Sequence, residues 1–172
     1  MTASRMHNEE AIEARLAAGI VVAAGSGSRL GGQVPKQFQL LAGKPVLLWS
    51  VEAMLRCNKF AEVIVVAPAA LVEETRALMP ANQPVRIVAG SPSSRTESVR
   101  NGLAALTGKP PRYVLIHDAA RPGLSQEVLD ELLNEDARCL EQNDWRHQKI
   151  RIHCQRQILF DVGRTGVENF LL

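Results

Sequence analysis

The sequence predicts a doubly wound α/β fold built on a mainly parallel sheet. Four short apolar runs, at residues 19–24, 62–67, 85–89 and 113–117, alternate with stretches of helical periodicity. Aromatic residues make up only 4% of the chain, so the core must be built from Val, Leu, Ile and Ala, as in buried parallel sheets. At 172 residues the chain suits one domain with right-handed crossovers.

Helices are expected between and after these runs. The expected segments begin at about Pro45 and cover residues 71–79, 96–106 and 125–133. Ser125 fits an N-cap, and Glu127 places an acid in the first turn of the last helix. In such sheets, ligands bind at the carboxyl ends of the strands.

The chain divides into three parts that differ in amino-acid composition. Residues 1–18 form an N-terminal extension, residues 19–134 the α/β domain, and residues 135–172 an atypical tail crowded with charged and amide groups. We expect regular structure to end near Leu133. The tail has the character of a truncated or shifted continuation, which predicts a fold that is incomplete at its C-terminal end.

Composition excludes several classes of protein. A net charge of +2 is too small for a nucleic-acid surface, and no apolar run reaches the length of a membrane span. Acidic residues before the first apolar run argue against a signal peptide, and three cysteines make no disulfide framework. These features predict a cytoplasmic protein. A zinc site is not expected, because the spacing of Cys139, His147, His153 and Cys154 matches no standard ligand pattern.

The loop after the first apolar run has the composition of a phosphate site. It reads A-A-G-S-G-S-R-L-G-G-Q-V-P-K-Q over residues 23–37. Gly25 and Gly27 let the backbone approach phosphate oxygens, and Arg29 and Lys36 add two cations. This combination predicts a triphosphate pocket that stabilises charge on a reacting phosphorus. The alternative is a glycine turn that carries two surface cations.

Two familiar nucleotide sites are excluded. The string G-x-x-x-x-G-K-[ST] of a P-loop does not occur. A dinucleotide site needs G-x-G-x-x-G and an acid after the second strand, whereas the second run here ends in Ala67 and Pro68.

Two further segments carry polar groups suited to a nucleotide. In H-D-A-A-R-P, residues 117–122, Asp118 can hold Mg²⁺ or a ribose hydroxyl, and Arg121 can meet phosphate or brace the loop. A structural Asp–Arg pair is the alternative. In R-T-E-S-V-R-N-G, Ser98 either contacts a base or phosphate or caps the helix. His117 is expected to orient its loop through a backbone contact without titrating.

The three motifs together resemble one enzyme family. In this order, A-A-G-x-G-x-R-x-G…P-K-Q, R-x-E-S-V-x-N-G-L and H-D-A-A-R-P are similar to the signature of 2-C-methyl-D-erythritol 4-phosphate cytidylyltransferases, over about residues 19–133. The resemblance implies a Rossmann-like fold of nucleotidyltransferase type. It also implies transfer of a cytidylyl group from CTP to the sugar-alcohol phosphate with Mg²⁺, release of pyrophosphate, a role in non-mevalonate isoprenoid synthesis, and a homodimer.

The resemblance also assigns roles to residues by motif. Arg29 and Lys36 match the catalytic cations, and Asp118 matches the aspartate near the ribose and the metal. Ser98 matches a cytidine-binding serine. The remaining nucleotide-binding candidates are Ala23, Ala24, Gly25, Ser26 and Gly27 in the backbone cradle, with Gly90, Arg95 and Arg121 from the other two motifs.

The chain also departs from the family pattern. The segment before Arg95 is one residue longer than expected, and the groups that hold the acceptor and the dimerising arm find no match in residues 135–172. The last departure predicts a chain that is monomeric or aggregates through a sheet edge. Two alternatives stay open: a ribitol 5-phosphate cytidylyltransferase, and a nucleotide-binding chain without turnover. The pair Ala119-Ala120 favours methylerythritol phosphate over ribitol phosphate.

Overall fold

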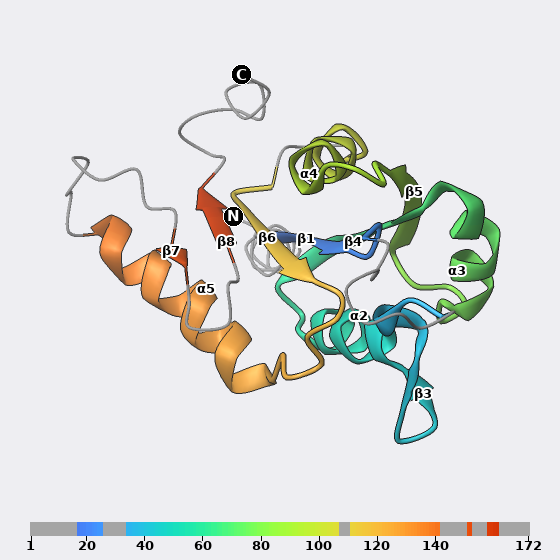
Figure 1. Ribbon diagram of the computed structural model, residues 1–172. Coiled ribbons are helices and arrows are strands. Elements are labelled where there is room, and N and C mark those ends of the chain that lie inside the picture. Colours follow the sequence, from blue (N-terminus) through green and yellow to red (C-terminus); the bar gives the residue numbers. More distant parts are fainter. Residues whose placement is uncertain (1–16, 26–33, 107–110, 142–150, 153–157, 162–172) are drawn as a thin grey trace.

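The computed structural model describes residues 17–25, 34–106, 111–141, 151–152 and 158–161. Six strands form one sheet in the order β5-β4-β1-β6-β8-β7 (Figure 1). The four expected strands are present as parallel neighbours, each within two residues of its expected ends. They are β1 (Ala17–Val22), β4 (Phe60–Pro68), β5 (Val85–Gly90) and β6 (Tyr113–Asp118). The predicted mainly parallel α/β fold is therefore confirmed.

The order of the strands creates a switch point beside β1. The chain moves outward from β1 to β4 and β5, then returns to the other side of β1 as β6. Val22 at the end of β1 is in register with Val66 of β4 and with Asp118 of β6. Loops that leave these strands therefore start at the same edge, where sheets of this type bind ligands.

Helices cover both faces of the sheet (Figure 1). They are α2 (Val46–Arg56), α3 (Val72–Leu78), α4 (Arg95–Ala104) and α5 (Gln126–Glu141), with 3-10 turns η2 (Lys36–Phe38) and η3 (Ala69–Leu71). A small hairpin of β2 (Leu40–Leu41) and β3 (Lys44–Pro45) precedes α2. Within the part of the chain that the structure describes, none of the helices combines the length and apolar character that a membrane crossing requires.

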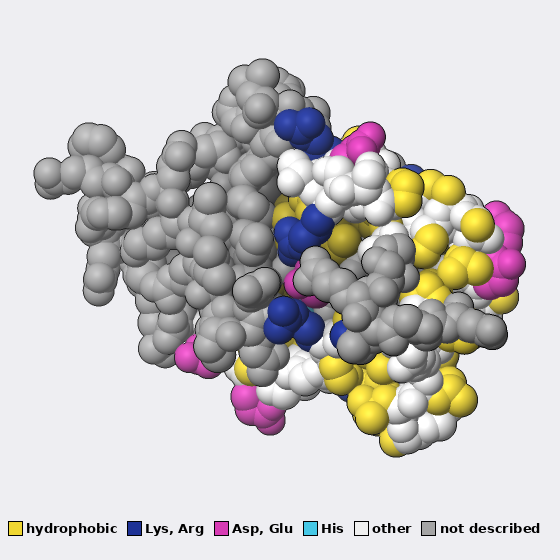
Figure 2. Space-filling model, viewed as in Figure 1, with side chains coloured by type: hydrophobic (Ala, Val, Ile, Leu, Met, Phe, Trp, Pro, Cys, Tyr) yellow, Lys and Arg dark blue, Asp and Glu magenta, His cyan; other side chains and the backbone are white. Residues whose placement is uncertain are grey.

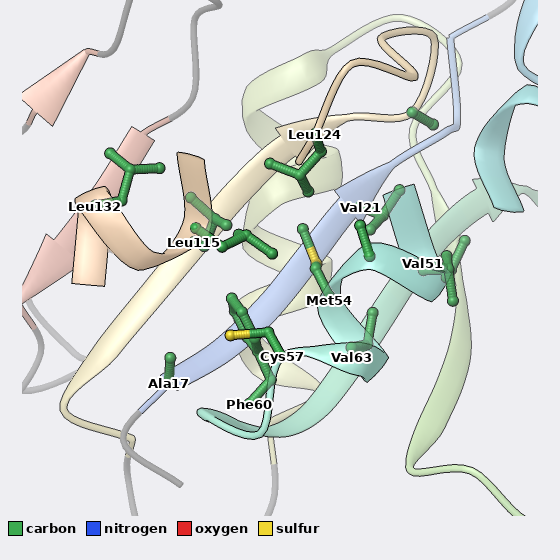
Figure 3. Close-up of a cluster of buried hydrophobic side chains, with 14 of the residues drawn as sticks. Ala17, Val21, Val51, Met54, Cys57, Phe60, Val63, Leu115, Leu124 and Leu132 are labelled. Atoms are coloured by element: carbon green, nitrogen blue, oxygen red, sulfur yellow. The ribbon is translucent and has the colours of Figure 1, made fainter. Parts of the chain in front are cut away.

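The core has two layers, one on each face of the sheet. On one face, α2 and α5 contribute Leu47, Met54 and Leu129 to a cluster that includes Val21 of β1 (Figure 3). On the other face, Leu103 of α4 packs in a cluster with Ile20, Ile64, Val66 and Ile116. Neighbouring residues of a strand point to opposite faces, so a strand covered on both sides is apolar at nearly every position.

The expectation that regular structure ends near Leu133 is wrong. Helix α5 continues to Glu141, and two short strands follow, β7 (Arg151–Ile152) and β8 (Ile158–Asp161). Strand β8 pairs antiparallel with β6, with Ile116 opposite Ile158. The cause lies in β6, whose backbone needs a partner on the side away from β1. The composition of residues 135–172 does not show that β6 needs a partner strand.

Candidate active site

The glycine loop is the segment that follows β1 from Ala23 onward. It begins in a fixed backbone conformation where it leaves β1. The N–H of Ala23 donates to the Val66 carbonyl at 2.8 Å. The side chain of Gln37, which is buried, donates from Nε2 to the carbonyls of Ala23 at 2.6 Å and Gly25 at 2.9 Å. Sequence reasoning missed this role of Gln37. The sequence feature that could have revealed it is the glutamine at the end of the P-K-Q string, because a glutamine amide has two hydrogens that it can donate.

Lys36 lies beside this contact, in the one-turn helix η2 that follows Pro35. Its side chain is exposed, and within the described residues it forms no ion pair. The ammonium is therefore available to an anion at this edge. The other residues assigned to this loop, Ser26, Gly27 and the cation Arg29, lie outside the described residues.

Gly90 ends β5 directly against the glycine loop. A Cβ atom built on Gly90 would lie 2.4 Å from Cβ of Ala24, 2.7 Å from Val66 Cγ1 and 2.9 Å from Ser98 Oγ. A real Cβ atom essentially never comes this close to an atom to which it is not bonded, so only glycine lets β5 and α4 approach the cradle this closely.

Ser98 is buried and fastens the loop between β5 and α4. Its Oγ accepts from the Ser91 N–H at 3.0 Å and lies 3.0 Å from the Ser94 carbonyl, to which it can donate. The alternative that Ser98 caps the helix is wrong. Ser94 is the N-cap of α4, and its side chain accepts from the Glu97 N–H at 3.1 Å.

Asp118 ends β6 and is held by two arginines. Arg95 donates from Nε at 3.0 Å and Nη2 at 2.9 Å to the same oxygen, Oδ1. Arg121 donates from Nε to the other oxygen, Oδ2, at a longer 3.4 Å. The structural Asp–Arg pair considered from the sequence is therefore present. Because these side chains are partly exposed, the pairs contribute little to stability and can exchange for ligand contacts.

His117 supports the Asp118 loop from inside. Its Nε2 lies 2.9 Å from the Arg121 carbonyl and 2.9 Å from Ser50 Oγ of α2. Burial lowers the pKa of His117, although the backbone contact with Arg121 opposes the shift. A neutral ring with its hydrogen on Nε2 fits, because it donates towards Arg121 and leaves only a lone pair on the buried Nδ1. The expected loop-orienting role is confirmed.

These contacts join the three motifs at one edge of the sheet. Gln37 touches the glycine loop, Gly90 packs on Ala24, and Arg95 of α4 bonds to Asp118 of β6. On the face in Figure 2, basic side chains in dark blue gather near the middle with an acidic group between them. The expectation that Gly25, Lys36, Ser98 and Asp118 lie at one edge is confirmed.

A divalent cation at this edge could take Asp118 as a protein ligand. Among the described residues, no group of three or more His, Cys, Asp or Glu side chains could hold a metal. Mg²⁺ is commonly bound by one or two carboxylates together with substrate phosphates and water, so Asp118 fits that role. Oδ2 is the more available oxygen, because its contact with Arg121 is the longer one.

Comparisons with known proteins agree with these motifs. The family model of 2-C-methyl-D-erythritol 4-phosphate cytidylyltransferase, IspD, matches residues 17–142. The bifunctional enzyme IspD/IspF of Novosphingobium aromaticivorans is 41% identical over 128 residues, which are 74% of this chain and 33% of that protein. The 2-C-methyl-D-erythritol 4-phosphate cytidylyltransferase of Endomicrobium trichonymphae is 41% identical over 121 residues, 70% of this chain and 53% of that protein. The chain thus spans about half or less of these relatives.

A solved structure supports the fold. The crystal structure of 4-diphosphocytidyl-2C-methyl-D-erythritol synthase from Anaerococcus prevotii matches with a TM-score of 0.66 and 21% identity, over 92% of this chain and 77% of that one. At this identity the likeness concerns the fold alone. The family model covers more than half of the sequence and includes all three motifs. The chain therefore belongs to the 2-C-methyl-D-erythritol 4-phosphate cytidylyltransferase (IspD) family.

Proposed function

We propose that the chain binds CTP with Mg²⁺ at the carboxyl edge of the sheet and transfers its cytidylyl group to 2-C-methyl-D-erythritol 4-phosphate. The observation that carries this proposal is the junction of the three motifs. A fixed backbone at Ala23 and Gly25, a Lys36 ammonium that has no ion pair among the described residues and a carboxylate between two arginines meet at the switch point. Membership in the family is the reason for choosing CTP as the nucleotide and 2-C-methyl-D-erythritol 4-phosphate as the acceptor.

The proposed reaction is an in-line displacement at phosphorus. A phosphate oxygen of the acceptor attacks the α-phosphorus of CTP, and the bond to the bridging oxygen of the β-phosphate breaks, so that pyrophosphate leaves. Negative charge then shifts towards the leaving group. Lys36, together with Arg29 from the same loop, stabilises this charge more strongly in the transition state than in the ground state.

The nucleoside end of CTP is assigned to the other two motifs. Asp118 accepts from a ribose hydroxyl or holds the cation, and Arg95 and Arg121 exchange their contacts with it for phosphate oxygens. A divalent cation, when bound, neutralises charge on the triphosphate. Ser98 and Gly90 place the loop of residues 91–94 where it can meet the base.

Calorimetry tests the nucleotide assignment. In the presence of Mg²⁺ the chain should bind CTP more tightly than ATP and show no binding of NAD. The affinity should fall as salt rises, because attraction between phosphates and cations contributes to it. Equal or tighter binding of NAD would overturn the proposal.

Pyrophosphate release tests the acceptor. With CTP bound, addition of 2-C-methyl-D-erythritol 4-phosphate should release pyrophosphate faster than addition of ribitol 5-phosphate. The opposite order would assign the chain to ribitol phosphate. CTP binding without release on either addition would favour a nucleotide-binding chain.

We also propose that the chain is cytoplasmic, and that it is monomeric or aggregates through an edge of its sheet. Sedimentation should give the mass of one chain or a broad distribution of aggregates, whereas a stable dimer would contradict this assignment.

A further inference from the structure

Gln37 joins two parts of the site that the sequence separates. Its backbone belongs to η2, the same 3-10 turn as Lys36. Its side chain reaches back 14 residues in the sequence, and only 5% of the residue is exposed. The two carbonyls that accept from Nε2, those of Ala23 and Gly25, belong to the start of the glycine loop. One buried amide therefore connects the cation-bearing turn to the backbone cradle.

The direction of these bonds determines what the cradle presents. In a trans peptide the carbonyl and the following N–H point in opposite directions. Because Gln37 holds the Ala23 carbonyl, the N–H of Ala24 is turned away from Gln37. Gly90 restrains the same residue from another side, since there is no room for a Cβ atom against Ala24. The peptide after Ala23 is therefore fixed by a hydrogen bond and by packing.

We propose that Gln37 is a positioning residue that fastens Ala23 and Gly25 to the turn carrying Lys36, so that the phosphate-binding backbone and the cation keep a fixed spacing. This inference rests on the proposed function. Gln37 touches no substrate in this proposal and acts through the cradle and Lys36. An unsatisfied buried carbonyl is costly, so loss of the amide should let the loop move until its carbonyls find other donors.

The chain offers a matched control on the same turn. Gln39 also donates from Nε2 to a backbone carbonyl, that of Val34 at 3.1 Å, but it is exposed and does not touch Ala23 or Gly25. Gln37→Met keeps length and volume while removing both donors. Gln39→Met makes the same chemical change away from the cradle. Gln37→Asn keeps an amide but is too short to reach both carbonyls.

Binding is measured first, by calorimetry with CTP and CMP in the presence of Mg²⁺. Gln37→Met should weaken CTP binding by about tenfold or more, because two hydrogen bonds to the cradle are lost. CMP binding should weaken less, since CMP lacks the outer phosphates that meet the cradle and Lys36. Gln37→Asn should fall between wild type and Gln37→Met, and Gln39→Met should stay within about twofold of wild type. A loss that is equal for CTP and CMP would indicate general damage and overturn the positioning role.

Hydrogen exchange tests the clamp without any ligand. The Ala23 N–H, bonded to the Val66 carbonyl, should exchange faster in Gln37→Met relative to the Ile20 N–H in the middle of β1. Unchanged exchange of Ala23 would overturn the proposal. If wild type fails to bind CTP, the proposed function fails, while this measurement still decides whether Gln37 holds the loop.

Discussion

Two glycines of the site serve different purposes at the residue scale. Gly90 has no room for a methyl group, whereas no described atom lies within 4 Å of a Cβ built on Gly25. The space at Gly25 is where the proposed function places phosphate. An alanine should therefore affect folding at one position and ligand binding at the other.

The pair Gly90→Ala and Gly25→Ala tests this difference. Gly90→Ala should lower the free energy of unfolding by about 1–3 kcal/mol, because Ala24 and Val66 must shift to admit the methyl group. Gly25→Ala should leave the free energy of unfolding within about 0.5 kcal/mol of wild type but weaken CTP binding. Urea denaturation and calorimetry on both variants measure the two effects. Equal destabilisation by both substitutions would contradict the packing at Gly90.

His117 should make stability depend on pH. Burial holds the pKa of His117 below its ordinary value of 6.5 in the folded chain. As the pH falls through about 6.5, the unfolded chain takes up a proton that the folded chain does not, so the free energy of unfolding falls. This contribution is complete above pH 6.5 and is lost towards the lower folded pKa, with a slope of at most about 1.4 kcal/mol per pH unit.

His117→Gln isolates this group, because His117 is the one titratable side chain that differs between the two proteins. Between pH 7.5 and 5.5, urea denaturation should show a smaller fall in stability for His117→Gln than for wild type. Parallel pH profiles would mean that His117 is charged or exposed in the folded chain.

Lys36 should matter more for the rate than for binding. Lys36→Met keeps the stem and removes the charge, so it should reduce the rate constant for cytidylyl transfer by about a hundredfold and weaken CTP binding much less. Lys44→Met is the matched control, since Lys44 pairs with Glu52 at the hairpin, at 2.6 Å, away from the cradle. Pyrophosphate release at saturating CTP measures the rate. A normal rate in Lys36→Met would make Lys36 a surface cation.

At the scale of elements, the start of α4 depends on its cap. The Ser94 side chain accepts from the Glu97 N–H, which otherwise has no partner in the first turn of the helix. Ser94→Ala should lower the free energy of unfolding by about 1 kcal/mol in urea denaturation. Ser93→Ala is the control, because Ser93 is exposed and, among the described residues, its Oγ is hydrogen-bonded only to the Ser91 hydroxyl, at 3.2 Å. A larger loss in Ser93→Ala than in Ser94→Ala would contradict the assigned cap.

At the scale of the whole molecule, stability should depend on the antiparallel edge of the sheet. At Leu159, β8 has β6 on one side and β7 on the other. Leu159→Pro removes an N–H that faces one of these strands, so it should cost more than about 1 kcal/mol in urea denaturation and expose the edge of β6. An unchanged urea midpoint would mean that β8 does not complete the sheet in solution.

The sequence predicted where the candidate site lies better than it predicted the contacts between the residues of the site. Glycine spacing and strand ends placed Gly25, Lys36 and Asp118 at one edge, because the carboxyl ends of parallel strands coincide. The sequence suggested Ser98 as a possible cap of α4, whereas the cap in the structure is Ser94. The difference depends on packing, because Ser98 is buried under the loop of residues 91–94 and Ser94 is only partly buried at the start of the helix.

The sequence by itself determined the strand-forming apolar runs, the helices between them and the three motifs, since hydrophobic period and glycine spacing are local properties. Only the tertiary structure decided what Gln37 holds, which arginines flank Asp118 and how β8 covers β6. Most of these contacts join residues far apart in the chain, such as Gln37 with Ala23 or Arg95 with Asp118, whereas Arg121 lies three residues from Asp118. Their partners are selected by what the packed core brings together and by which buried backbone groups still need a hydrogen bond.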